Sequence, residues 1–494
     1  MTSFDGDAWG IDFGTTNSAL FAYIGRYGSQ PSSTNFDDAG KPVPSVVAID
    51  RQSGIVFVGR EAKRRYLNNP RQYAYIHSVK TVLEDDSWRL EVAGRVLRPV
   101  DVAAEIFRKL KDLARERQYH VNRVVVAVPN GASGKKRARI YEAAKIAGLT
   151  VRQFVTEPLA AFFANFNHLR NERYVAVFDW GGGTLDITVL ENRADGKIVE
   201  LSKAGLQEAG DELNVAIARE IHRRLVDLRG LEKSFAEMPS IDRERLVEQC
   251  EKAKCGLSEK EEEVVALMDY GGLVVNESLT RRQLGDVIRP YVRRALELLS
   301  KVIAESKLTK EDIGKVLIVG GSSRLLDVRE GIERMFAGAA DKILKPKDAE
   351  WNVAKGAGRL DYRKGEYFSA EDIGVILGDE NKTFYPLLHG YFSTSPNPLS
   401  RFCLASSFGI METTEYPRIV FAARDAEGRK RVLDSTVVAR AYRFLTEAIE
   451  MDVVVNEALV FCARVRSGNT TDANALYWEY PDLRLVYEAP TFGV

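Results

Sequence analysis

Cysteine and histidine are scarce in this chain of 494 residues, which contains four cysteines and five histidines. The cysteines, at positions 250, 255, 403 and 462, are scattered, so they predict reduced thiols in a cytosol rather than a disulfide framework. Cys250 and Cys255 are close in sequence but lack the second Cys or His pair of a zinc site, and the histidines show no metal-ligand spacing. We therefore expect neither a disulfide scaffold nor a zinc protein.

Net charge and long apolar runs are also absent. The 70 basic and 70 acidic side chains cancel, so the composition implies no nucleic-acid partner and no anionic membrane surface. No apolar run approaches the ~20 residues that cross a bilayer. Residues 1–10 contain two aspartates and no basic stretch of the kind that opens a secretory signal. These absences predict a cytoplasmic protein with no membrane partner.

Short β-branched runs alternate with amphipathic helical stretches through roughly the first 365 residues. Three runs are almost wholly apolar, as expected of central strands buried on both faces, at residues 124–128, 174–178 and 315–319. Four helices are predicted, at residues 102–116, 136–147, 244–254 and 290–305. The last of them opens with Pro290, which suits a first helical position. The alternation predicts an α/β protein with layered sheets.

The pattern changes from about Tyr367. Apolar and polar residues then alternate in runs such as 417–422 and 450–455, with turn residues between them. The length is too great for one hydrophobic core. The sequence therefore predicts two domains, an α/β domain at residues 1–365 and a small β-rich, β-sandwich-like domain at residues 366–494.

Two similar motifs within the chain contain the residues that predict its chemical function. The sequences GIDFGTTN at residues 10–17 and VFDWGGGTLD at residues 177–186 both read as a buried strand ending in Asp, a glycine turn, a Thr and a second strand. Glycine lets backbone N–H groups approach a phosphate, and the hydroxyls add donors. A third turn, GGSSR, occupies residues 320–324. One such turn alone is more often an ordinary loop, but together they predict two duplicated α/β halves around one nucleotide.

These motifs resemble those of actin-like ATPases and, within them, of DnaK-type heat-shock chaperones. GIDFGTTNS resembles the family's first phosphate loop, FDWGGGTLDI its second and KVLIVGGSSRL its adenosine motif. The stretch VVVAVPNGASGKKRARIYEAAKIAGLTVRQFVTEPLAAFFAN resembles the connecting segment, and the resemblance covers nearly all of residues 8–363. It implies duplicated actin-like, ribonuclease-H-like halves around a nucleotide cleft, with ATP or ADP and Mg²⁺ as cofactors.

Carried over residue by residue, the resemblance implies a role for each matching position. The catalytic residues would be Lys80, near the γ-phosphate and the attacking water, Glu157, which orders that water, Asp179 and Thr184. The hydrated Mg²⁺ would be held by Asp12 and Asp179. The phosphate side of the cofactor site would comprise Gly14, Thr15, Thr16, Asn17, Gly181, Gly182, Gly183, Asp186 and Gly210. The nucleoside side would comprise Glu251, Lys254, Ser258, Gly320, Gly321, Ser322 and Arg324.

Each assignment has a plainer alternative. Taken singly, Lys80 reads as a surface lysine and Glu157 as a helix-entry acid beside Pro158. Positions 251, 254 and 258 share one helix face, which would ordinarily be solvated. Four C-terminal aromatic residues could line a peptide groove, although core packing is the commoner role, namely Phe392, Phe402, Phe421 and Phe461.

Three features depart from the family's pattern. Cys255 stands where the family has a second adenine-stacking side chain, and Gln153 stands where it has an arginine of the J-domain contact. Residues 364–371, KGEYFSAE, lack the leucine-rich linker that transmits the ATP signal, so we expect weak coupling through this segment. Because no helical stretch follows the β-rich residues in this sequence, we expect no helical lid.

Two functions remain open. The first is a slowly hydrolysing, chaperone-like ATPase whose nucleotide state modulates binding of a protein client, with a nucleotide-exchange or cochaperone factor as a further partner. The second is a nucleotide-sensing regulatory or scaffold subunit dedicated to one protein partner, which the altered linker favours. A filament-forming actin relative or a sugar kinase shares the phosphate loops but is disfavoured by the connecting segment and the added β-domain.

Overall fold

The computed structural model of the chain describes most of the first 389 residues and seven shorter stretches beyond them. The described residues are 7–25, 32–336, 340–363, 366–369, 371–389, 404–408, 418–425, 428–437, 449–455, 461–467, 476–480 and 485–488. Within them, no helix is long and apolar enough to cross a membrane.

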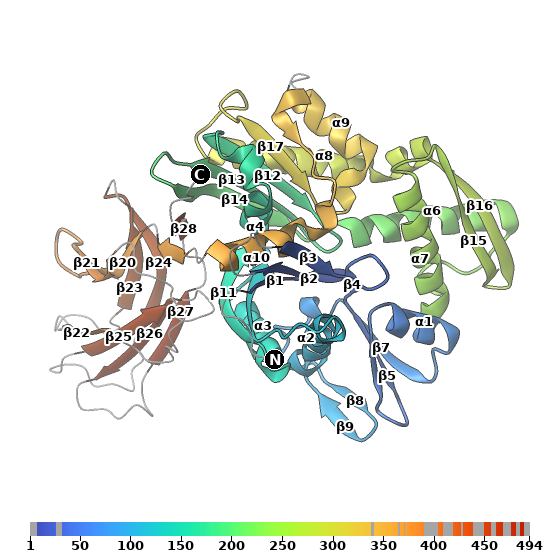
Figure 1. Ribbon diagram of the computed structural model, residues 1–494, viewed down its shortest axis with the longest axis horizontal. Coiled ribbons are helices and arrows are strands. Elements are labelled where there is room, and N and C mark those ends of the chain that lie inside the picture. Colours follow the sequence, from blue (N-terminus) through green and yellow to red (C-terminus); the bar gives the residue numbers. More distant parts are fainter. Residues whose placement is uncertain are drawn as a thin grey trace.

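Two mixed sheets form the frame of the molecule (Figure 1). The first sheet has the order β11-β10-β1-β2-β3, with β4 paired to β2, and comprises β1 Ala8–Phe13, β2 Asn17–Ile24, β3 Ser32–Phe36, β4 Val43–Pro44, β10 Arg123–Val128 and β11 Thr150–Thr156. The second has the order β18-β17-β12-β13-β14-β28-β19 and comprises β12 Tyr174–Trp180, β13 Leu185–Asn192, β14 Lys197–Leu206, β17 Lys315–Val319, β18 Ile343–Leu344, β19 Glu366–Ser369 and β28 Leu485–Glu488.

The two sheets repeat one arrangement. In the first, β1 pairs antiparallel with β2 and parallel with β10, which pairs parallel with β11. In the second, β12 pairs antiparallel with β13 and parallel with β17, which pairs parallel with β18. This repeat agrees with the duplicated halves expected from the sequence. We call each sheet with its helices a lobe.

Helices cover the sheets, so that strands such as β10 are buried on both faces. They are α1 Arg60–Asn68, α2 Pro99–Glu116, α3 Gly134–Ile146, α4 Glu157–Ala164, α5 Phe166–Leu169, α6 Gly210–Arg229, α7 Ser240–Gly256, α8 Arg281–Glu305, α9 Leu326–Met335 and α10 Asn352–Arg363. Helix α10 packs on β1 and α4 through glycines. A Cβ on Gly10 would lie 2.1 Å from the Gly358 nitrogen, and one on Gly356 would lie 1.6 Å from the Ala160 oxygen.

The predicted helices at 102–116, 136–147 and 244–254 are confirmed as α2, α3 and α7. The expected start of the fourth helix at Pro290 is wrong, because α8 begins at Arg281 and Pro290 lies inside it. Thr280 caps the helix by accepting a hydrogen bond from the Gln283 nitrogen, and the Gln283 side chain accepts one from the Thr280 nitrogen. Buried Leu284 and Ile288 precede the proline, so core packing continues the helix through it.

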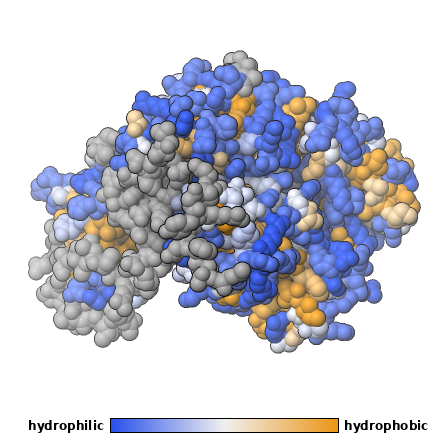
Figure 2. Space-filling view, viewed as in Figure 1, coloured by the Kyte–Doolittle hydropathy of each residue, from blue (hydrophilic) through white to orange (hydrophobic). Residues whose placement is uncertain are grey.

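Three small sheets extend the lobes. They contain β5 Val46–Asp50, β6 Val56–Val58 and β7 Tyr73–His77, then β8 Leu90–Val92 and β9 Arg95–Leu97, and finally β15 Glu262–Tyr270 and β16 Leu273–Thr280. The β15–β16 hairpin buries Val265 and Val275 but exposes Val264, Met268 and Val274. Figure 2 shows apolar residues gathered over this hairpin.

Beyond α10 the described residues form strands and turns. Two four-stranded antiparallel sheets contain β20 Asp372–Ile376, β21 Phe384–Leu388, β23 Arg418–Arg424 and β24 Lys430–Val437, and β22 Leu404–Phe408, β25 Ile449–Val455, β26 Phe461–Ser467 and β27 Leu476–Tyr480. Phe421 of one sheet stacks on Trp478 of the other, with ring centroids 4.1 Å apart, and contacts Phe461. Phe421 and Phe461 are fully buried, so they are core residues. Phe392 and Phe402 lie outside the described residues.

Candidate functional site

The two glycine turns meet between the lobes. The turn between β1 and β2 contains Thr15 and Thr16, and the turn between β12 and β13 contains Gly182 and Gly183. A Cβ on Gly182 would lie 2.0 Å from the Thr16 hydroxyl oxygen, and one on Gly183 would lie 2.4 Å from the Thr15 Cβ. This approach is available only to glycine at both positions.

A buried ion pair lies beside the turns. Lys80 occupies a 3₁₀ turn at Val79–Thr81, and Glu157 is the first residue of α4. The Lys80 Nζ donates to the Glu157 Oε1 at 3.0 Å, and both residues are buried. Lys80 is therefore not a surface lysine, although nothing in its local sequence predicts burial.

Three aspartates face this pair. Burial and then the charge of Glu157 raise the pKa of Asp12 to about 7, against the lowering effect of Lys80. Burial and the charges of Glu157, Asp186 and Asp12 raise the pKa of Asp179 well above its usual value. Four carboxyl groups thus share one lysine, and unpaired buried negative charge of this kind is unfavourable.

Asp186 lies opposite Asp179 on the neighbouring strand. Its Oδ1 accepts a hydrogen bond from the Asn130 nitrogen at 2.8 Å, whereas its buried Oδ2 has no hydrogen-bond partner among the described residues. Burial and the charge of Glu157 raise its pKa to about 7, partly offset by the nearby Thr184 hydroxyl and the Asn130 hydrogen bond. A cavity of about 100 Å³ opens here, lined among others by Thr15, Lys80, Thr184 and Asp186.

These observations fit a divalent cation beside phosphate. The Asp186 Oδ2 without a hydrogen-bond partner and the four buried carboxyl groups beside Lys80 would both be stabilised by an additional positive charge. Among the described residues no three His, Cys, Asp or Glu side chains form a direct metal-binding group. Asp12 and Asp179 therefore suit an ion held largely through its water shell, as Mg²⁺ usually is.

The nucleotide-free protein is expected to lose stability as pH rises from about 4 to about 7. The folded-state pKa of Asp186 is about 7, whereas an unfolded aspartate titrates near ~3.9, so the folded state holds a proton that the unfolded state has released. The stability from this carboxyl group is fully present below about pH 4 and is lost progressively as pH rises to about 7. Thermal unfolding of the parent and of Asp186→Asn measures it. An unchanged pH dependence in the variant would contradict the assignment.

The start of α6 holds the second turn in place. The Gly210 nitrogen donates to the Gly181 oxygen at 3.1 Å, and the Asp211 nitrogen donates to the Gly182 oxygen at 2.8 Å. The Asp211 carboxylate also accepts from the Thr16 hydroxyl at 2.8 Å, which ties the first turn to the same helix. Burial raises the pKa of Asp211 to about 6.

Sequence reasoning missed Asp211 and Asn130. Asp211 directly follows Gly210, and Asn130 directly follows the buried run of β10 and Pro129. A polar residue immediately after a buried strand, or at the start of a helix that follows a glycine, is the signal that could have found both.

The nucleoside residues are only partly brought together. The Lys254 Nζ donates to the Gly210 oxygen at 3.0 Å, and burial lowers its pKa. Ser322 donates to the Gly181 oxygen at 2.8 Å, so the third turn joins the second. Arg324 instead lies 3.5 Å from the Lys347 oxygen and 4.0 Å from the Glu350 carboxylate. These contacts place Lys254 and Ser322 beside the second glycine turn, while Arg324 is held by the loop before α10.

Glu251 contributes to a contact between the lobes. The Lys63 Nζ, on α1 of the first lobe, lies 3.7 Å from carboxylate oxygens of both Glu248 and Glu251, on α7 of the second. The Arg245 side chain adds a hydrogen bond of 2.8 Å to the Leu67 oxygen. Helices α1 and α7 are thus linked between the two lobes.

We expect Lys63→Ala to speed ADP release about 2- to 5-fold, because two partly buried ion pairs across the lobes are lost. Stopped-flow release of a fluorescent ADP measures the rate. Lys252→Ala is the matched control, since Lys252 pairs with Glu248 within α7 at 3.2 Å and bridges no lobes. Equal acceleration by the two variants would argue against a role for the contact between α1 and α7.

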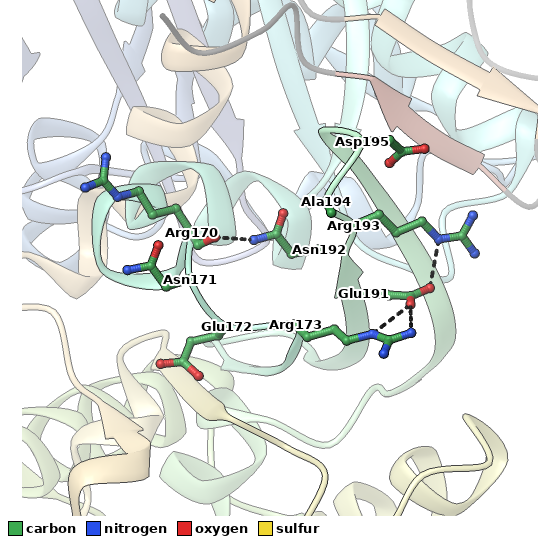
Figure 3. Close-up of a pocket in the computed structure, with 9 residues that line it drawn as sticks. All are labelled: Arg170, Asn171, Glu172, Arg173, Glu191, Asn192, Arg193, Ala194 and Asp195. Atoms are coloured by element: carbon green, nitrogen blue, oxygen red, sulfur yellow. Dashed lines mark hydrogen bonds and ion pairs between the residues drawn. The ribbon is translucent and has the colours of Figure 1, made fainter. Parts of the chain in front are cut away.

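A second and larger cavity, of about 740 Å³, lies at the far end of β12 and β13 from the glycine turns. Figure 3 shows it between the loop before β12 and the turn after β13. Its Arg173 and Arg193 both pair with Glu191, at 3.1 and 2.9 Å. It contains none of the residues assigned to the nucleotide.

Comparison with known protein families matches residues 8–360 to the Hsp70 protein family, over more than two thirds of the chain. The match ends within α10, so the C-terminal sheets lie outside it. Members of this family have the actin-like ATPase fold, with which the two repeated sheets agree. The chain therefore belongs to the Hsp70 family.

Proposed function

We propose that this chain is a slow, Mg²⁺-dependent ATPase of the chaperone type, whose nucleotide state modulates the binding of a protein client or partner. Hsp70 proteins are ATP-binding chaperones that hydrolyse ATP and act with protein clients and cochaperones. The observation in this chain that supports the proposal is the buried Lys80–Glu157 pair facing Asp12, Asp179 and Asp186.

Each residue has a role in this proposal. Asp12 and Asp179 hold the hydrated Mg²⁺, which when bound supplies positive charge against the phosphates. The glycine turns present backbone N–H groups to the phosphate oxygens. Lys80 stabilises the charge that develops on the transferred phosphoryl group, and Glu157 positions both Lys80 and the attacking water. No covalent nucleophile is needed.

The nucleoside is assigned to residues around α7 and the third turn, namely Glu251, Lys254, Ser258, Gly320, Gly321, Ser322 and Arg324. We propose residues 366–494 as the partner-binding part, in which the two four-stranded sheets pack as a β-sandwich. Contacts between their aromatic residues support this packing. The Cys250 and Cys255 thiols, which form no disulfide among the described residues, are compatible with a reducing, cytoplasmic compartment.

A single-turnover assay tests the proposal. When the protein is in excess over ATP and Mg²⁺ is present, ADP should form slowly. Chelation of the Mg²⁺ should stop ADP formation. Addition of unfolded peptide should change the rate if client binding and hydrolysis are linked. Bound ATP that is never converted would contradict the proposal and favour a nucleotide-sensing regulatory subunit.

A further inference from the structure

The C-terminal strand β28 pairs with the sheet of the second lobe. Val486, Tyr487 and Glu488 pair antiparallel with residues 197–199 of β14. On its other edge β28 pairs with β19, the strand that directly follows the first domain. Figure 1 shows β28 between this lobe and the C-terminal sheets. The C-terminal part is thus attached to the sheet of the second lobe by both the strand that leads into it and a strand from its far end.

Strand β14 extends from β28 to the candidate active site. Its first residues pair with β28, and its last, Gly205 and Leu206, line the 100 Å³ cavity with Gln207. The pairing of β14 with β13 shifts register where Leu190 faces Glu200, so that a β-bulge separates the two ends. A bulge bends a strand locally, and Glu200 lies at this bend.

Glu200 connects the bend to the catalytic pair. Its Oε1 accepts a hydrogen bond of 2.7 Å from the Thr156 hydroxyl, and its Oε2 lies 3.0 Å from the Lys203 Nζ. Thr156 immediately precedes Glu157 and makes no side-chain cap on α4. The hydroxyl is therefore committed to Glu200, across the boundary between the lobes.

We propose that Glu200 and Thr156 are positioning residues that couple β28, and with it the C-terminal domain, to the nucleotide site. A shift of β14 on nucleotide exchange changes the bend at Glu200, and the Thr156 hydrogen bond carries that change to Glu157 and Lys80. This route runs through the C-terminal strand and does not need a leucine-rich linker. It rests on the proposed function, because nucleotide must bind at the glycine turns for the route to be used.

Hydrogen exchange on the full chain tests the coupling in one direction. In the parent, the amide hydrogen-exchange rates of residues 485–488 and 366–369 should differ at least 5-fold between the ATP-bound and the ADP-bound protein. Thr156→Val keeps the side-chain shape but removes the donor, so the difference should fall below 2-fold. Thr156→Ser keeps a hydroxyl and should retain it. A parent-like difference in Thr156→Val, or no difference in the parent, would overturn the inference.

The same data separate this inference from the proposed function. Protection of residues 14–16 and 181–184 by nucleotide reports binding at the turns, whatever β28 does. If the turns are protected while β28 does not respond, the coupling fails and the proposed function stands. If nucleotide protects neither region, the proposed function fails and the coupling fails with it.

A double-mutant cycle tests the reverse direction, because coupling between two sites is reciprocal. Val486→Pro removes one backbone donor from β28, with Val486→Ala as the matched control. Val486→Pro should change single-turnover hydrolysis at least 3-fold in the parent and less than 1.5-fold in Thr156→Val. If the effects of Val486→Pro and Thr156→Val on the hydrolysis rate multiply independently in the double variant, the two positions are not coupled and the inference is overturned.

Discussion

Replacing Lys80 with alanine should lower the rate of ATP hydrolysis about 100-fold or more, while ATP binding changes little. Among the described residues, Lys80 is the cation that faces Asp12, Asp179 and Glu157 in the buried centre. Its charge is needed most when negative charge shifts on the transferred phosphoryl group, so its removal raises the barrier more than it weakens binding. Single-turnover kinetics and calorimetric titration with ATP measure the two effects separately.

Loss of Lys80 also leaves Glu157 buried without its partner, which is destabilising in its own right. The control is Lys80→Met combined with Glu157→Gln, which removes both charges together. This double variant should unfold near the parental temperature and still fail to hydrolyse ATP. Parental hydrolysis by Lys80→Ala would show that turnover does not need Lys80, whereas recovery of hydrolysis in the double variant would show that Lys80 acts only through stability.

Replacing Gly182 with alanine should weaken nucleotide binding about 100-fold, equivalent to about 2.7 kcal/mol. The added methyl group would lie 2.0 Å from the Thr16 hydroxyl oxygen. Relief of this contact requires Thr16 to move, which breaks its 2.8 Å hydrogen bond to Asp211. Both turns would then lose the fixed positions from which their N–H groups face the phosphates.

Gly181→Ala is the matched control in the same turn. Its added methyl group would lie 3.6 Å from the Thr184 oxygen, an ordinary contact. Fluorescent ADP titration should therefore give a much smaller loss for Gly181→Ala than for Gly182→Ala, with both variants folded by circular dichroism. Equal losses would mean that backbone freedom at the turn matters, and that the packing of the two turns does not.

The sequence by itself determined the central strands and the two glycine turns. Apolar runs such as 315–319 admit little besides a buried strand, and this one is observed with the predicted bounds. Asp12 and Asp179 could be predicted as candidate site residues because each lies near the end of such a run, just before a glycine turn. Helix boundaries were less certain, as α8 shows, since capping at Thr280 and burial of Leu284 outweighed the proline signal.

Only the tertiary structure decided which side chains share the buried centre. Lys80 and Glu157 are 77 positions apart and pair because the fold removes both from water. Local patterns mark Asp211 and Asn130 as candidates, but their hydrogen bonds to Thr16 and Asp186 form only in the folded chain. The attachment of β28 to β14 likewise depends on backbone pairing between residues almost three hundred positions apart. Local sequence sets strand and turn preferences, whereas burial, charge balance and strand pairing depend on segments that meet only in the folded chain.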